Sequence, residues 1–118
     1  MTFRHKIVLV AFPFDDLNSS KVRPALCLTE PVGSRKHIVL AFITSRLPPA
    51  PYPTDILLTQ DQPDFVLTGL RVASAVRLHR LLTVSAEVVV RRQLGVLPPS
   101  LAGRVQEGLR QLFGIDRQ

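Results

Sequence analysis

The sequence predicts an α+β domain, in which a small, strongly bent β-barrel packs against one C-terminal helix. Short β-branched and apolar runs separated by turn residues fill the first two thirds of the chain. An amphipathic pattern with helical spacing appears only near the C-terminus. The length of 118 residues fits a single domain (1–118), and 46% hydrophobic residues are enough to fill its core.

Four segments in the first half predict strands. The runs Lys6–Phe12, Arg23–Thr29 and His37–Thr44 are almost continuously apolar rather than alternating, which is typical of strands buried on both faces. Pro13 ends the first run, because proline cannot donate to a ladder. Asp55–Thr59 is the fourth and shortest strand.

Turn-forming and proline-rich segments connect these strands. Asp15–Lys21 is a polar loop, and Pro31–Ser34 forms a turn. Arg46–Pro53 holds four prolines, so we expect a stiff surface loop.

The second half predicts one strand and two helices. The strand covers Arg71–Val76, with a continuation to Leu82 left open. Ser85–Gln93 is predicted as a short helix with Ser85 as N-cap, ended by Gly95. The final helix starts at Pro99 and stops before Gly114. Its apolar face has helical spacing and consists of Leu101, Val105, Leu109, Leu112 and Phe113.

Composition excludes several classes of protein. Cys27 is the single cysteine, which excludes an intrachain disulfide, and the three histidines lack zinc-site spacing. The acids are dispersed, which argues against a two-metal nuclease, and no phosphate-loop or dinucleotide motif occurs. No apolar run approaches the ~20 residues of a membrane span. Since Pro13 interrupts the first apolar run and no cleavage site follows, we expect a cytoplasmic protein without a signal peptide.

The charge pattern points to an anionic partner. The formal net charge is +6, with twelve arginines and three lysines, and arginine's planar fork suits bidentate phosphate recognition. Between Arg46 and Arg71 no cation occurs, whereas basic residues gather at 21–23, 35–36, 77–80 and 91–92. Aromatic residues are only 6% of the chain, and Tyr52 is the one exposed candidate for base stacking.

Three motifs resemble the PemK/MazF family of toxin endoribonucleases. They are Val22-Arg23-Pro24, Ile43-Thr44-Ser45 and Ser74-Ala75-Val76-Arg77. The resemblance implies an SH3-like barrel of the CcdB/PemK type that forms a homodimer. It also implies sequence-selective, metal-independent cleavage of single-stranded RNA (mRNA) without a cofactor. A co-expressed antitoxin, expected to be acidic and encoded adjacently, would inhibit it.

The resemblance also implies roles for individual residues. Arg23 matches the family's catalytic arginine and Thr44 its catalytic hydroxyl residue, followed by Ser45. Arg77 falls on a position that binds phosphate in some members. His79 stands where an acidic residue is commoner, which leaves the general base open. The further candidates for substrate binding are the neighbouring cations Lys21 and Arg80.

The chemistry of RNA cleavage fits these residue types. A base must deprotonate the attacking 2′-hydroxyl, an acid must protonate the leaving oxygen, and a cation must stabilise the phosphorane-like transition state. Arg23 is the predicted cation, Thr44 fixes the phosphate, and His79 is the natural acid or base near neutral pH. Because strand residues two apart share a face, Arg77 and His79 should lie side by side.

Two non-enzymatic interpretations remain open. One is an inhibitor built on the same barrel, of the kind that poisons DNA gyrase. The other is an inactive homologue that only binds RNA or antitoxin. The presence of both Arg23 and Thr44 disfavours the first, and the unusual His79 keeps the second open.

Overall fold

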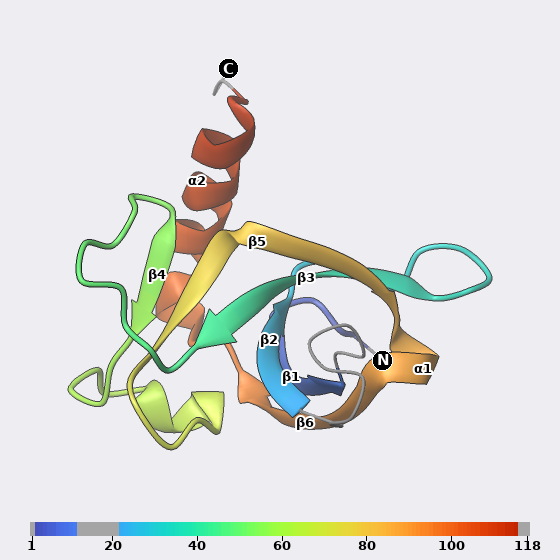
Figure 1. Cartoon of the computed structure of the whole chain (residues 1–118), viewed down its shortest axis with the longest axis horizontal. Coiled ribbons are helices and arrows are strands. Elements are labelled where there is room, and N and C mark those ends of the chain that lie inside the picture. Colours follow the sequence, from blue (N-terminus) through green and yellow to red (C-terminus); the bar gives the residue numbers. More distant parts are fainter. Residues whose placement is uncertain (1, 12–21, 116–118) are drawn as a thin grey trace.

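The computed structural model describes residues 2–11 and 22–115, and its body is a curled, six-stranded antiparallel sheet (Figure 1). The strands are joined in the order β4-β5-β3-β2-β1-β6. Their bounds are β1 Lys6–Ala11, β2 Val22–Cys27, β3 His37–Thr44, β4 Asp55–Leu58, β5 Ser74–Ser85 and β6 Val90–Val96. Every pairing in the sheet is antiparallel.

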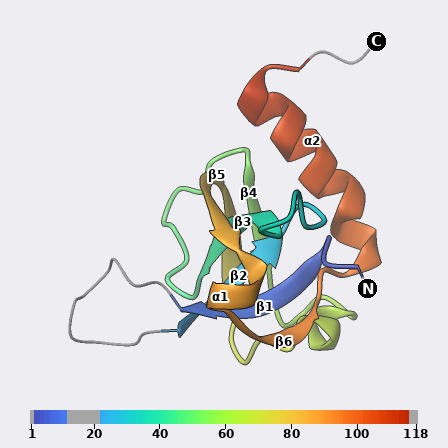
Figure 2. The same cartoon turned by 90° about the vertical axis from the view of Figure 1, so that its right-hand side faces the viewer.

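The helix α2 (Ala102–Phe113) follows the sheet and projects beyond it at its C-terminal end (Figure 2). It is preceded by a 3-10 turn, η2 (Pro99–Leu101), and ends at Gly114, whose φ of 66° is left-handed. Val105 and Gly108 are the residues that α2 buries. The predicted C-terminal helix and its end at Gly114 are thereby confirmed. No helix in the described ranges is both long enough and apolar enough to span a membrane.

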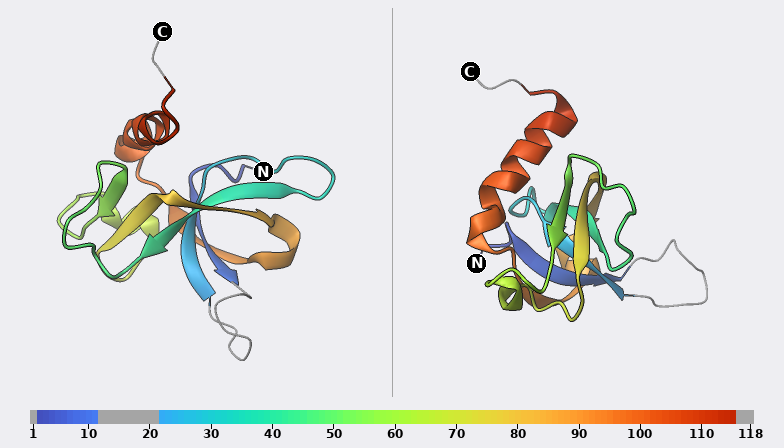
Figure 3. Two further views of the ribbon diagram at one scale, coloured as in Figure 1. Left: turned by 45° about the horizontal axis from the view of Figure 1, so that its top comes forward. Right: turned by 90° about the vertical axis from the view of Figure 1, so that its left-hand side faces the viewer.

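A bend in β5 gives the sheet its curl. The ladder between β3 and β5 passes from the pair Ala41↔Leu81 directly to Phe42↔Arg77, so residues 78–80 have no partner on β3. Such an insertion bends and twists a strand, and Figure 3 shows the two halves of β5 running in different directions. The α+β class is therefore confirmed. The sheet is curled, but its edge strands β4 and β6 are not hydrogen-bonded to each other within the described residues.

Both faces of the sheet are buried, as the continuous apolar runs predicted. One face packs Ile7, Leu26, Ile43 and Val76 against the turn η1 (Phe65–Thr68) and helix α2. The opposite face carries a second cluster, built from Val8, Val10, Ala25, Cys27, Ile38, Leu40 and Ala86. Burial raises the pKa of the Cys27 thiol to about 11, so it stays protonated and unreactive near neutral pH.

The predicted helix over Ser85–Gln93 is wrong. Only one short turn, α1 (Ala86–Val89), is helical, and residues 90–96 form strand β6 along β1. The ladder with β1 and the β-branched valines outweigh the local helix signal. Gly95 ends no helix, because it lies inside β6, where an added Cβ would overlap the carbonyl of Leu67.

The other strand predictions differ only at their ends. β2 stops at Cys27 and β4 at Leu58, each shorter than predicted. β5 begins at Ser74 rather than Arg71 and extends past Leu82 to Ser85, so the continuation left open is real. The predicted loop Asp15–Lys21, with its candidate Lys21, lies outside the described residues.

Candidate functional site

A pocket of about 260 Å³ opens where β2 starts, β3 ends and the chain enters β5. Its polar lining consists of three arginines, Arg23, Arg46 and Arg71, and three hydroxyl residues, Thr44, Ser45 and Ser74. Apolar residues such as Leu70 and Val72 complete the wall, and no carboxylate occurs among its described lining residues. The pocket therefore has the composition of an anion-binding site.

Sheet register places Arg23 and Thr44 opposite each other. The β2–β3 ladder pairs Ala25 with Phe42, and the same register continued by two residues brings Arg23 opposite Thr44. On its other side Arg23 pairs with Val10, a member of the second core cluster. Since side chains alternate along a strand, Arg23 and Thr44 share that face of the sheet. A cation and a hydroxyl thus meet in one pocket.

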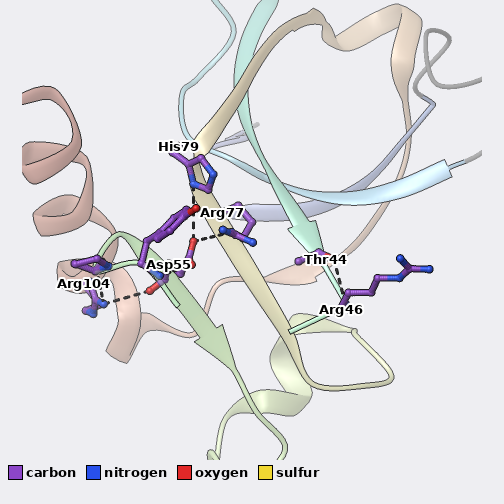
Figure 4. A network of polar contacts seen from close by, with 8 residues as sticks. Thr44, Arg46, Asp55, Arg77, His79 and Arg104 are labelled. Carbon is purple, nitrogen blue, oxygen red and sulfur yellow. Dashed lines mark hydrogen bonds and ion pairs between the residues drawn. The ribbon is translucent and has the colours of Figure 1, made fainter. Parts of the chain in front are cut away.

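The hydroxyl of Thr44 is fixed at the end of β3. Its Oγ1 accepts a hydrogen bond of 3.1 Å from the backbone N–H of Arg46 (Figure 4). A hydroxyl that accepts from the backbone still has its own proton to donate. Ser74 differs, because its buried hydroxyl donates to the carbonyl of Val72 at 3.0 Å. Thr44 can therefore donate to a bound anion, while Ser74 holds the pocket wall.

Arg77 and His79 lie in a second cluster around Asp55, on the β4 side of β5 (Figure 4). The side chain of Asp55 is fully buried. Its Oδ1 forms an ion pair of 2.8 Å with Arg77 Nε and lies 3.9 Å from His79 Nδ1. The Arg77 guanidinium and the His79 ring also contact the ring of Tyr52. We refer to Asp55, Arg77, His79 and Tyr52 as the Asp55 cluster.

The predicted site residues therefore fall into separate places. Arg23, Thr44 and Ser45 line one pocket. Arg77 and His79 lie side by side, as their spacing predicted, because both face the same oxygen of Asp55. The pocket lining includes neither of them, nor Arg80, whose guanidinium lies 4.9 Å from the ring centre of Phe42.

Three residues of these sites escaped the sequence prediction. Arg46 and Arg71 line the pocket from two loops separated by 25 positions, and only the fold shows that they converge. Asp55 carried a usable signal, since an acid opening an apolar strand is unusual and such buried acids are normally paired.

The described residues contain no group of three or more His, Cys, Asp or Glu side chains that could share a metal ion. Metal-independent chemistry thus stays a prediction. Its direct test is cleavage in the presence of EDTA.

Comparisons with known proteins agree on one family. Residues 3–113 match the family model of the PemK-like, MazF-like toxin of type II toxin-antitoxin system. The Mycobacterium tuberculosis toxin MazF-mt6 superposes with a TM-score of 0.72 at 22% identity, covering 95% of this chain and 99% of that one. An endoribonuclease from a Mycobacterial species, solved with its cognate antitoxin, gives 0.69 at 15% identity with 100% of both chains covered.

A third relative is MazF in the MazE-MazF structure from Deinococcus radiodurans. It has a TM-score of 0.67 at 20% identity and covers 96% of this chain and 95% of that one. No curated protein matches by sequence. At these identities the solved structures show a shared fold.

Proposed function

The chain belongs to the PemK-like, MazF-like toxins of type II toxin-antitoxin systems, and we propose that it is an endoribonuclease that cleaves single-stranded RNA (mRNA) sequence-selectively without a metal ion. The observation that carries the proposal is the meeting of Arg23 and Thr44 in a pocket lined by arginines. Two solved relatives are themselves described as endoribonucleases. A phosphodiester is the anion that this combination of family and pocket favours.

The proposed reaction is an internal transphosphorylation. The 2′-oxygen forms a bond to the adjacent phosphorus as its proton passes to a base, and the bond to the 5′-oxygen breaks as that oxygen gains a proton. The products are a 2′,3′-cyclic phosphate and a 5′-hydroxyl. Arg23 neutralises the charge that develops on the non-bridging oxygens, and Thr44 donates a hydrogen bond to one of them. Ser45, Arg46 and Arg71 bind the flanking backbone.

Replacing Thr44 by valine is expected to lower the cleavage rate about 10- to 150-fold, because a hydrogen bond to a charged group contributes about 1.5–3 kcal/mol. Valine keeps the β-branched shape and removes the hydroxyl. Thr44→Ser retains the hydroxyl and should cleave at a rate close to that of the wild type. Single-turnover cleavage of labelled RNA measures both variants. Full activity of Thr44→Val would remove this hydroxyl from the mechanism.

His79 is the proposed general base. Its ring lies beside Arg77 on β5, outside the pocket, with Nδ1 3.9 Å from Asp55 Oδ1. The role therefore requires that RNA bound in the pocket extends across β5, so that the attacking 2′-hydroxyl reaches this ring. Removal of a general base typically costs about 10²–10⁴-fold in rate. We therefore expect His79→Ala to lose kcat by that factor while its affinity for RNA changes far less. Unchanged cleavage by His79→Ala would assign the base to another group.

The partners follow from the family and the charge. Solved relatives are complexes with their cognate antitoxins. We propose that this protein acts as a cytoplasmic homodimer and that an acidic antitoxin, encoded adjacently, binds its basic surface. Co-expression with the neighbouring reading frame, followed by co-purification at low and high salt, tests the partner. A neighbour that is not acidic, or that fails to co-purify at any salt concentration, would contradict it.

A further inference from the structure

Tyr52 is an exposed aromatic residue, 54% accessible, on the loop that precedes β4. We propose that its ring is the surface on which one unpaired base of the RNA stacks while the neighbouring phosphate lies in the Arg23 and Thr44 pocket. This inference rests on the proposed function and adds to it a base-binding subsite.

The backbone around Tyr52 is held from two sides. Its N–H donates to Asp55 Oδ2 at 2.8 Å, and its carbonyl accepts from the Asp55 N–H at 3.0 Å. From α2, the Arg104 guanidinium donates to the carbonyls of Pro53 and Asp55 at 2.9 and 3.2 Å (Figure 4). The loop is therefore tied both to the sheet and to the helix.

The ring of Tyr52 is also oriented. Arg77 Cζ lies 5.1 Å from its centre, a cation–π contact, and the ring of His79 meets it at 5.2 Å with an interplanar angle of 71°. These contacts fix the ring while about half of the residue stays open to solvent. A ring ordered before binding loses little entropy when a base stacks on it.

The register of the sheet places Arg77, which contacts this ring, near the pocket. Thr44 pairs with Ala75, and Arg77 lies two residues further along β5, on the same face as Ala75. Such diagonal neighbours are about 7–8 Å apart, which is comparable with the spacing of successive nucleotides in a single strand. A strand whose phosphate occupies the pocket can therefore cross β5 toward Tyr52.

The pocket of Arg23 and Thr44 and the Asp55 cluster differ in net charge. The described lining of the pocket contains three arginines and no carboxylate. In the Asp55 cluster, the buried carboxylate neutralises Arg77 at 2.8 Å. The cluster therefore favours an uncharged, flat group over a second phosphate, and a nucleobase is such a group. Because every base has a π-face, Tyr52 would contribute affinity and position rather than base identity.

The test uses an RNA oligonucleotide that contains the cleaved sequence, with a 2′-deoxy sugar at the cleavage position so that it binds without being cut. Tyr52→Ala is expected to weaken its binding about 5- to 150-fold, the contribution of one stacked base. Tyr52→Phe should retain the wild-type affinity. Phe113 is similarly exposed, at 59%, but ends helix α2, so Phe113→Ala is the matched control and should bind normally. Thermal unfolding establishes that each variant is folded.

An abasic scan identifies the contact. When the stacked base is removed from the oligonucleotide, wild type and Tyr52→Ala should bind it equally well. Equal loss by Tyr52→Ala on intact and abasic RNA, or no loss at all, would overturn the stacking role while leaving the cleavage proposal intact. Loss of antitoxin binding with RNA binding unchanged would assign Tyr52 to a protein partner instead. A wild type that neither binds nor cuts RNA would refute both proposals.

Discussion

Arg23→Ala is expected to lower RNA cleavage by at least about 10²–10³-fold, the usual loss when a donor aimed at transition-state charge is removed. Arg23 lies opposite Thr44 in the pocket, and its planar fork can hold two non-bridging oxygens at once. The assay incubates purified protein with labelled single-stranded RNA in EDTA, and wild-type activity should be unaffected by the chelator.

Two further variants test whether activity depends on the charge of Arg23, on its planar guanidinium or on its position in the pocket. Arg23→Lys keeps the charge but loses the bidentate fork, so its rate should fall between those of Arg23→Ala and the wild type. Arg35→Ala is the matched control, because Arg35 is an exposed arginine in the turn before β3, at the opposite end of that strand from Thr44. Its cleavage rate should equal that of the wild type.

The same assay decides among the interpretations left open by the sequence. If Arg23→Ala cuts as well as the wild type, Arg23 is not the catalytic cation. If the wild type leaves RNA intact, the enzymatic assignment fails. An inhibitor of the gyrase-poison type, or an inactive homologue that binds only RNA or antitoxin, would then take its place. A gyrase supercoiling assay and an RNA-binding measurement distinguish these two.

Those parts of the fold that depend on local signals were predictable. β1 and β3 follow from continuous apolar runs, because strands buried on both faces have little need for polar residues. Helix α2 follows from its periodic apolar face, from Pro99 before it and from Gly114 after it. The pairing of Arg77 with His79 on one face follows from the two-residue period of a strand.

Those parts that depend on long-range pairing were not predictable. Residues 90–96 form a strand only because β1 offers an unpaired edge about 80 positions earlier in the sequence. Asp55 meets Arg77 through the β4–β5 register, and Arg46 meets Arg71 through the convergence of two loops. No local sequence pattern predicts which of these distant residues come into contact. Arg23 and Thr44, which line one pocket, were named as candidates because of a family resemblance rather than because of their spacing.

Gly69→Ala is expected to destabilise the protein by about 2–5 kcal/mol, the largest effect we expect from a single methyl group in the described part of the chain. Gly69 has a φ of 71°, and a left-handed conformation costs other residues about 1–2 kcal/mol. An added Cβ would also overlap the Leu94 carbonyl of β6, and overpacking adds about 1–3 kcal/mol. Since Leu70 and Val72 follow directly and line the pocket, cleavage should fall as well. Urea unfolding measures the loss of stability.

Alanine substitutions at two other glycines separate the cost of the left-handed backbone from the cost of the steric overlap. Gly33 has a similar φ of 76° but nothing within 4 Å of an added Cβ, so Gly33→Ala should lose only the conformational part, about 1–2 kcal/mol. Gly103 lies in helix α2 with equally open space, and Gly103→Ala should stabilise the protein by about 0.5–1 kcal/mol, the difference in helix propensity. The excess loss of Gly69→Ala over Gly33→Ala therefore measures the close contact between the chain after η1 and strand β6. Equal losses for the two would show that this contact, and with it the support of the pocket wall by β6, contributes nothing to stability.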